Sequence, residues 1–277
     1  MDKIPADPAG QRHGIKYDPV TTCEVAALVR LNSDTSQLTL KAPRIAAAAE
    51  PGQFVNLEAG HFLRRPIGVM AVDRQQGLVQ LGIRVQGRGT QWLSRLRPGT
   101  VLSVMGPLGK GFQLEGYRRV ITVGGGTGVF PLYYVQQMCR EQGIDGIAVC
   151  GYRSKADSVL TDHYRAAGCQ VLFASDEGDL DVEGHAAAAL EQLLQSLEMD
   201  RQEDTLIAAC GPNIMMQAVA KIADVYQYDC QVSLEERMAC GVGVCLVCVC
   251  KTKTKTGEAN SRCCVDGPVF PAKEVVW

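Results

Sequence analysis

The sequence predicts a protein of class β plus α/β in three parts: an antiparallel β-barrel, a doubly wound parallel sheet with helices, and a small domain built on a cysteine loop. Three observations lead to this prediction. Residues 20–116 hold short strand-like segments divided by turn residues. Residues 117–228 alternate buried strands with helical stretches, which is typical of a parallel sheet covered by helices. Residues 229–277 are rich in cysteine, with six of the twelve cysteines of the chain between 240 and 264.

The composition is that of a folded protein without strong charge. Of 277 residues, 46% are hydrophobic and 21% are charged, and the net charge of −2 gives no electrostatic reason to expect binding to nucleic acid or to a membrane. Residues 1–19 are charged and broken by Pro and Gly, so we expect an N-terminal extension that is neither a signal peptide nor an anchor. No apolar run approaches the roughly 18 residues of a membrane span. We therefore expect a cytoplasmic protein.

The first part is expected to form a small barrel, with a sandwich as the alternative. Five segments have the alternating or apolar pattern of strands: CEVAALVRL, SQLTLKAP, PGQFVNLEAG, RRPIGVMAVD and GLVQLGIRV. The alanines at 46–49 could add a helical turn, which Pro51 and Gly52 would end.

The second part is expected to form the parallel sheet. Apolar strands are predicted in RRVITV, GIAVCGY, CQVLFAS and DTLIAACGP, and helices at 132–143, 184–199 and 213–227. In such a sheet, ligands bind at the carboxyl ends of the strands. The loops that follow the strands are therefore the first places to look for a site.

A glycine-rich loop, VGGGTGVFP, follows the first of these strands. Its glycines are Gly124, Gly125, Gly126 and Gly128. Glycines let the backbone approach a pyrophosphate, and the following helix offers free N–H groups and a partial positive charge. The loop departs from G-x-G-x-x-G because Val129 occupies the last glycine position, so it indicates a nucleotide mainly through its strand–loop–helix context.

Two other segments carry candidate ligand contacts. Cys210, Gly211 and Pro212 form a second loop between a strand and a helix, for which a simple turn around a buried thiol is the alternative. Arg64 and Arg65 precede a proline at a strand start, and a guanidinium suits bidentate contact with phosphate. The alternative for this pair is an ordinary exposed pair of charges.

The cysteine block supplies the strongest signal. Cys240, Cys245 and Cys248 follow the C-x4-C-x2-C spacing of plant-type [2Fe–2S] proteins, with a further cysteine downstream. Zinc is an alternative, and a disulfide framework is less expected in a reducing compartment. The Lys/Thr run KTKTKTGE is expected at an exposed hairpin tip. The remaining cysteines are expected to be small buried side chains: Cys23, Cys139, Cys150, Cys169, Cys210 and Cys230.

These parts together indicate an electron relay. Nicotinamides transfer two electrons as hydride, whereas a [2Fe–2S] cluster transfers one, and a flavin can work in both ways. The motifs also resemble those of the iron–sulfur/FAD electron-transfer subunits of NAD-dependent dihydroorotate dehydrogenase B, over residues 20–277. SLEERMACGVGVCLVCVCK, CVDGPVF and EVVW are the most specific, supported by PGQF, RRPIGV, GRGT, GPLGKGF, GGGTGVFPL and CGPNIMMQAV. The broader ferredoxin–NADP reductase-like oxidoreductases lack the cysteine block.

The resemblance implies that FAD lies along the barrel. The matching residues are Arg65, Pro66, Ile67, Gly68, Gly82, Ile83, Arg84, Gly89 and Thr90. Ile67 would lie flat against the isoalloxazine, and Arg65 would counter the pyrophosphate charge. Gly68 stands where the family usually has Ser, and Ile83 stands where an aromatic residue is common, so the affinity for FAD stays open.

The resemblance also implies sites for the cluster and for NAD. The cluster ligands would be Cys240, Cys245, Cys248 and Cys264. Counting back from DGPVF selects Cys264, although the adjacent Cys263 keeps the fourth ligand open, and Cys250 would be structural. NAD would lie between glycine loop 124–128 and the turn Cys210, Gly211 and Pro212. Asp176 and Glu177 would take the adenosine ribose and favour NAD, whereas Arg153 and Lys155 would favour NADP.

The implied function is that of an oxidoreductase subunit in pyrimidine biosynthesis. It would pass electrons from the FMN of a separate catalytic subunit through [2Fe–2S] and FAD to NAD⁺, in a heterotetramer with two copies of each subunit. Without an orotate-binding barrel of its own, the chain is not expected to oxidise dihydroorotate alone, and no catalytic residue is assigned. The alternatives are the same relay serving a hydrogenase, a sulfite reductase or a ferredoxin-linked transhydrogenase, or a non-catalytic zinc-binding module.

Overall fold

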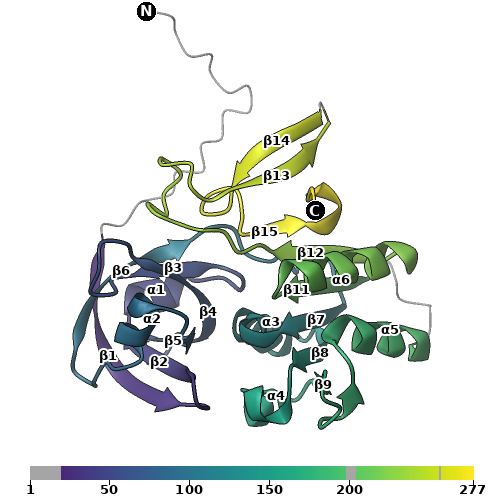
Figure 1. Cartoon of the computed structure of the whole chain (residues 1–277), viewed down its shortest axis with the longest axis horizontal. Helices are drawn as coiled ribbons and strands as arrows, with labels where there is room; N and C mark the ends of the chain where they lie inside the picture. Colours follow the sequence, from purple (N-terminus) through teal and green to yellow (C-terminus); the bar gives the residue numbers. More distant parts are fainter. Residues whose placement is uncertain (1–19, 198–203, 256) are drawn as a thin grey trace, which may run out of the picture.

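The computed structural model describes residues 20–197, 204–255 and 257–277. The expected N-terminal extension at 1–19 and the last two residues of the expected helix at 184–199 lie outside this range. Figure 1 shows a β-barrel beside a helix-covered sheet, with a β-hairpin above the junction between them. The predicted fold class is confirmed. No helix among the described residues is long and apolar enough to cross a membrane.

The barrel is closed by six antiparallel strands in the order β1-β2-β5-β4-β3-β6. They are β1 (Thr21–Arg30), β2 (Thr35–Lys41), β3 (Phe54–Leu57), β4 (Arg65–Asp73), β5 (Leu78–Arg84) and β6 (Val101–Leu108). Two short helices accompany them, α1 (Pro43–Ala48) and α2 (Arg88–Leu93). The sequence patterns predicted five of these strands, and the structure adds β6, which pairs with both β3 and β1 and so closes the barrel.

The sheet has seven strands in the order β10-β9-β8-β7-β11-β12-β15. They are β7 (Arg119–Gly125), β8 (Asp145–Tyr152), β9 (Gln170–Ser175), β10 (Val182–Glu183), β11 (Thr205–Cys210), β12 (Asp229–Ser233) and β15 (Val269–Pro271). Its main helices are α3 (Val129–Gln142), α4 (Thr161–Ala166), α5 (Ala186–Ser196) and α6 (Asn213–Val225). From β7 the chain first adds strands on one side and then, with β11, on the other. A ligand is expected at that reversal, where the loops after β7 and β11 diverge.

The cysteine-rich region is built into the sheet. β12 pairs in parallel with β11, and β15 pairs with β12 in antiparallel, while only β13 (Val249–Thr254) and β14 (Gly257–Arg262) form a separate hairpin. Cys248, Cys264 and Phe270 belong to the same buried cluster as Ile121 and Val123 of the central strand. The division of the chain at residues 20, 117 and 229 therefore stays a proposal, and the last division follows the cysteine loop more closely than the sheet.

Helix α3 connects the barrel to the sheet (Figure 1). The Gln137 side chain exchanges hydrogen bonds with the backbone of Val72 in β4, at 2.8 and 3.3 Å. The buried Tyr134 hydroxyl donates to the carbonyl oxygen of Ala49 at 2.7 Å. The first turn of α3 packs Phe130 against Gly82 and Pro131 against Gly68. The two glycines thus let the helix approach the barrel wall closely.

Candidate functional site

A cavity of about 270 Å³ lies where the barrel, the first turn of α3 and the segment after β12 meet. Its lining includes seven of the predicted flavin contacts: Arg65, Pro66, Ile67, Gly68, Gly82, Arg84 and Thr90. Segment 233–238 and Phe130 form the opposite side. Ile83, in contrast, is fully buried in the barrel interior, and Gly89 is buried behind Arg65.

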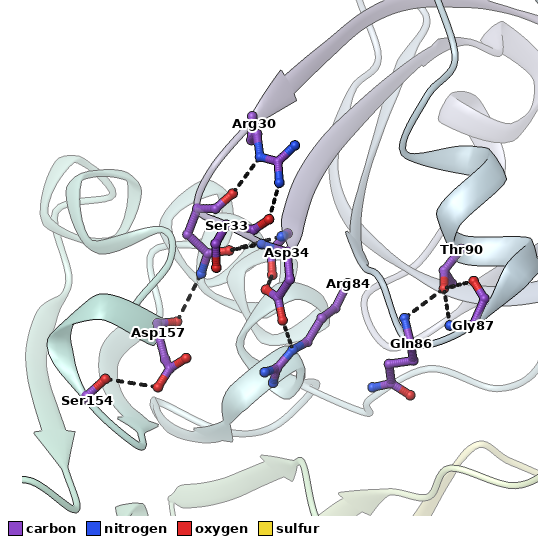
Figure 2. A network of polar contacts seen from close by, with 11 residues as sticks. Arg30, Ser33, Asp34, Arg84, Gln86, Gly87, Thr90, Ser154 and Asp157 are labelled. Atoms are coloured by element: carbon purple, nitrogen blue, oxygen red, sulfur yellow. Dashed lines mark hydrogen bonds and ion pairs between the residues drawn. The ribbon is translucent and has the colours of Figure 1, made fainter.

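Arg65 and the turn before α2 are arranged to receive an anion. A Cβ atom on Gly89 would lie 2.4 Å from Arg65 Nε, so the guanidinium rests directly on this glycine. Thr90 Oγ1 accepts hydrogen bonds from the backbone N–H groups of Gln86, at 2.9 Å, and Gly87, at 3.2 Å (Figure 2). A guanidinium held beside an ordered turn is suited to a phosphate. The residues of this cavity therefore fit a flavin nucleotide.

A second cavity, of about 580 Å³, opens at the carboxyl ends of β7 and β11. Gly125, Gly126, Asp176 and Pro212 line it, as the sequence predicts for a nucleotide, and Arg153 lies there as well. It shares Arg84, Thr127 and Phe130 with the first cavity, so the two sites are neighbours.

Of the other predicted nucleotide residues, Gly124, Gly128 and Gly211 do not line this cavity, and Cys210 lines the first cavity instead. A Cβ atom on Gly128 would be 2.0 Å from the carbonyl oxygen of Cys210, and one on Gly211 would be 3.0 Å from the backbone of Gly125. A Cβ atom on Gly124 would meet Val129 at 2.9 Å. Gly128 and Gly211 let the two loops touch each other, and Gly124 makes room for Val129, so the three glycines shape the cavity without lining it.

The barrel also contributes to the nucleotide cavity, which sequence patterns did not predict. The turn between β1 and β2 places Asn32 and Asp34 at its wall. Arg84 Nε donates to Asp34 Oδ2 at 2.8 Å, and Asn32 Nδ2 donates to the carbonyl oxygen of Asp157 at 3.4 Å (Figure 2). Hydrogen bonds from Thr35 and Arg84 hold the pKa of Asp34 below its usual range. Asn, Ser and Asp are common in turns, so nothing in the sequence marked them as site residues.

The choice between NAD and NADP rests on charged side chains at and near the nucleotide cavity. Arg153 lies 3.6 Å from Glu177 in an exposed ion pair, and Asp179 accepts the backbone N–H of Lys155 at 2.9 Å. Asp176 lines the cavity, whereas neither Lys155 nor Glu177 is among the lining residues. The acidic and basic candidates thus offset one another, and NAD remains the prediction.

Cys210 lines the first cavity, which we call the flavin cavity. Burial raises the pKa of its thiol to about 12, assisted by the charge of Glu235 and opposed by a hydrogen bond with Ser233. Cys210 is therefore a neutral thiol near pH 7. Desolvation also raises the pKa of Glu235, which lines the same cavity.

The cysteine loop surrounds its sulfurs with backbone N–H groups. Val242 N–H donates to Cys240 Sγ at 3.4 Å, Gly243 N–H to Cys264 Sγ at 3.2 Å, and Cys240 N–H to Cys245 Sγ at 3.5 Å. Gly241 and Gly243 have left-handed backbones, with φ of +72° and +80°, which turn these groups inward. Such bonds favour thiolates, and although burial opposes them, they lower the pKa of Cys240 to about 6.

The thiols of the block fall into pairs. The Cys240 thiol interacts with that of Cys245, and the Cys264 thiol with that of Cys248. The Cys263 thiol interacts instead with Cys250, and this interaction together with burial raises its pKa. The four predicted ligands are thus brought together, and the neighbouring Cys250 and Cys263 form a separate buried pair.

Four cysteine thiolates are ligands that both iron–sulfur clusters and zinc take, so the preference for a cluster rests on the C-x4-C-x2-C spacing. Within residues 20–197, 204–255 and 257–277, no three His, Cys, Asp or Glu side chains are already grouped as a metal site.

Comparison with known proteins agrees with this geometry. Residues 22–112 match the model of the oxidoreductase FAD-binding domain, and residues 235–276 match that of the iron–sulfur cluster binding domain of dihydroorotate dehydrogenase B. The electron transfer subunit of dihydroorotate dehydrogenase B (NAD(+)) from Desulforamulus reducens is 35% identical over 263 residues, covering 93% of this chain and 98% of that protein. Its counterpart from Bacillus caldolyticus is 37% identical, covering 87% and 93%.

Solved structures give the same fold. A chain of an NADH-dependent reduced ferredoxin–NADP oxidoreductase superimposes with a TM-score of 0.82 at 28% identity, covering 94% of this chain and 91% of that one. The ferredoxin reductase of carbazole 1,9a-dioxygenase shares only the fold, with a TM-score of 0.64 at 21% identity over 76% and 67%. With an FAD-binding domain, an iron–sulfur cluster-binding domain and this identity along nearly its whole length, the chain belongs to the family of electron transfer subunits of NAD⁺-dependent dihydroorotate dehydrogenase B.

Proposed function

We propose that this chain carries electrons from a separate FMN-containing catalytic subunit, through a [2Fe–2S] cluster and FAD, to NAD⁺ in pyrimidine biosynthesis. The assembly would be a heterotetramer with two copies of each subunit. We also propose a cytoplasmic location, because a reducing compartment would keep the cysteines of the loop available as thiolate ligands. When bound, the flavin supplies the exchange between single electrons and hydride, and the cluster supplies the single-electron step.

One observation carries the proposal: three adjacent sites form a continuous series. The flavin cavity shares Arg84, Thr127 and Phe130 with the nucleotide cavity, so a hydride donor and acceptor would meet there. On its other side, segment 233–238 leads from the flavin cavity into the cysteine loop at Cys240. A nucleotide, a flavin and a cluster held in these sites would be neighbours in the order that the relay requires.

The residues of the chain bind and orient the three groups. Arg65 would pair with the pyrophosphate of FAD, and Thr90 would hold the turn beside it. Gly125 and Gly126 would admit the nucleotide phosphates, and Asp176 would accept the ribose hydroxyls. All nine predicted flavin positions and all eight predicted nucleotide positions remain part of this proposal, those that lie behind the cavities as supports of their walls.

For the cluster we propose Cys240, Cys245, Cys248 and Cys264 as ligands. Support comes from the N–H···S bond between Gly243 and Cys264 and from the interaction of the Cys263 thiol with Cys250. Two irons would then bind the pairs Cys240/Cys245 and Cys248/Cys264.

A visible spectrum of the purified chain, recorded anaerobically before and after NADH, tests the site assignments. We expect flavin and iron–sulfur absorption, with acid-labile sulfide present, and bleaching of both by NADH. A preparation that contains zinc and no sulfide would overturn the proposal.

A second experiment tests the partner. We expect NAD⁺ reduction to become dependent on dihydroorotate only when the FMN-containing dihydroorotate dehydrogenase subunit is added, and not with the chain alone. The similarity to a ferredoxin–NADP oxidoreductase chain makes reduced ferredoxin the matched alternative donor. Transfer from ferredoxin without any transfer from dihydroorotate would assign the same relay to another complex.

A further inference from the structure

Asn56 in β3 is a buried amide without a partner. Its side chain is 1% exposed, and neither Nδ2 nor Oδ1 has a hydrogen-bond partner among the described residues. Nearly all buried amides are paired, because water no longer solvates them. Gln136 Oε1 also lacks a partner, but Gln136 Nε2 is hydrogen-bonded, whereas both amide atoms of Asn56 are without one among the described residues. In a protein that binds cofactors, an amide unpaired at both atoms points to a bound group as its partner.

The direction of the Asn56 side chain follows from strand alternation. Its neighbours Val55 and Leu57 are packed in the barrel interior. Asn56 therefore points outward, on the same face as Phe54. Phe54 lines the flavin cavity.

The amide of Asn56 touches the cysteine loop. A Cβ atom on Gly241 would lie 2.8 Å from Asn56 Nδ2 and 3.7 Å from its Cγ. Gly241 directly follows Cys240, whose sulfur accepts the N–H of Val242 at 3.4 Å. The unpaired donor thus lies against the backbone that encloses the thiolates.

We propose that Asn56 Nδ2–H donates a hydrogen bond to a sulfur of the cluster held by the cysteine loop, and that Asn56 is the barrel residue that tunes this cluster. This inference rests on the proposed function, because it needs a cluster in the loop. A donor to a cluster sulfur favours the reduced, more negative state and so raises the reduction potential. Phe54 and Asn56 are about 7 Å apart along β3, so one strand face would contact the flavin site and the cluster site.

The test replaces Asn56 and measures the cluster itself. Asn56→Leu has nearly the same volume and no donor, so we expect the equilibrium constant for cluster reduction to fall about tenfold in an EPR-monitored redox titration. Asn56→Asp replaces the donor with an acceptor and should lower this constant at least as far. Gln136→Leu is the matched control: it removes another buried amide, one that bonds Thr122 and Ile147 within the sheet domain, and should leave the cluster potential unchanged.

A measurement on the wild-type chain keeps the inference testable if the variants fail to load a cluster. In protein labelled with ¹⁵N in the asparagine side chains, pulsed EPR of the reduced cluster should detect coupling to an amide nitrogen. Absence of that coupling, or an unchanged potential in a loaded Asn56→Leu chain, would overturn the inference. A wild-type chain without iron and sulfide would instead contradict the proposed function, so the two failures are distinguishable.

Discussion

At the scale of single residues, several glycines of this chain make room for close contacts between its own segments. Gly82 accommodates the Phe130 ring, and Gly128 accommodates the carbonyl group of Cys210. A glycine-rich motif therefore predicts that something comes close to the backbone, without saying whether it is a cofactor or another part of the chain. Gly126 lines the cavity with open space beside it, whereas Gly125 lines the cavity and also packs against Met215, where a Cβ atom would lie 2.5 Å from the sulfur.

Gly128→Ala should disrupt the nucleotide cavity. The new Cβ would lie 2.0 Å from a backbone oxygen, so the loops after β7 and β11 must separate. We expect a lower melting temperature and an NADH affinity weakened at least tenfold, measured by thermal unfolding and by fluorescence titration. Gly87→Ala is the control, because Gly87 has an extended backbone and open space around it, and it should change neither value. Unchanged NADH binding in Gly128→Ala would contradict the role given to the loop contact.

Arg65→Ala should weaken FAD binding. Loss of a charge-assisted contact costs about 1.5–3 kcal/mol, or roughly 10- to 100-fold in the dissociation constant. Equilibrium dialysis of the FAD-depleted chain measures it. The adjacent Arg64 is the matched control: its guanidinium donates to the carbonyl oxygens of Asn56 and Ser103, so Arg64→Ala should lower stability more than FAD affinity. If both variants lost the same FAD affinity, the assignment of the phosphate contact to Arg65 would be wrong.

The Asp34–Arg84 pair should make the free energy of unfolding depend on pH in the acidic range. The pKa of Asp34 is held below its usual value of 3.8, so its contribution is present above that pH and is lost as the pH falls through the lower folded-state value. Both side chains are partly exposed, which limits the contribution to about 0.2–1 kcal/mol. Asp34→Asn should therefore be slightly less stable than wild type at pH 7, and the difference should shrink as the pH falls below 3.8. Urea unfolding over a series of pH values from 7 downward measures this difference, and a constant gap would refute it.

At the scale of elements, α3 packs against both the barrel and the sheet and so connects them. Its first turn seals the barrel, and its other face packs in the buried cluster that contains Val120 of β7. The glycine loop and α3 are consecutive in the sequence, so the element that opens the nucleotide site also joins it to the flavin barrel. A helical pattern predicts the helix, but it does not say that the barrel is the partner of its first turn.

Phe130→Ala should loosen the junction between barrel and sheet. Truncation of a buried phenylalanine typically costs about 3–5 kcal/mol. We expect a large drop in melting temperature. We also expect limited proteolysis to cleave the variant near residue 117, with the fragments identified by mass spectrometry. The control Ile214→Ala alters an exposed side chain of α6 and should stay within about 0.5 kcal/mol of wild type. A melting temperature equal to that of wild type would show that α3 does not carry the junction.

At the scale of the whole molecule, the three sites lie around one junction. The flavin cavity is bounded by barrel, helix and the segment that leads to the cysteine loop. β12 and β15 continue the sheet beneath the hairpin, which fixes the cysteine loop against the barrel (Figure 1). Distances between the groups of a relay are thus set by sheet packing and not by flexible linkers.

Removal of the cluster should divide the relay into two halves. Cys240→Ser should abolish cluster loading and electron exchange with the catalytic subunit. Bleaching of FAD by NADH should persist, because the nucleotide and flavin cavities share a wall that contains no cysteine of the loop. Stopped-flow absorbance at the flavin band measures both processes. Cys263→Ser is the matched control and should keep its cluster, because its thiol faces Cys250. Loss of the cluster in Cys263→Ser would move the fourth ligand to that position.

The sequence by itself determined the fold class, the parallel order of the second part and the chemistry of the cysteine loop. Strand and helix periods are local, and Cys240, Cys245 and Cys248 lie so close together that a single loop gathers them. Glycines between a strand and a helix are likewise close together in the sequence, so a single loop gathers them. Local spacing is therefore enough to name the type of site.

Only the tertiary structure decided how distant segments meet. It paired Cys263 with Cys250, enclosed Ile83 in the barrel, and brought the β1–β2 turn to the nucleotide cavity. It also placed Asn56 against Gly241, from opposite ends of the chain. Such contacts depend on the packing of whole sheets, and a single asparagine or aspartate has no periodicity that could reveal its partner. Burial without a hydrogen-bond partner becomes visible only when both surfaces are in place.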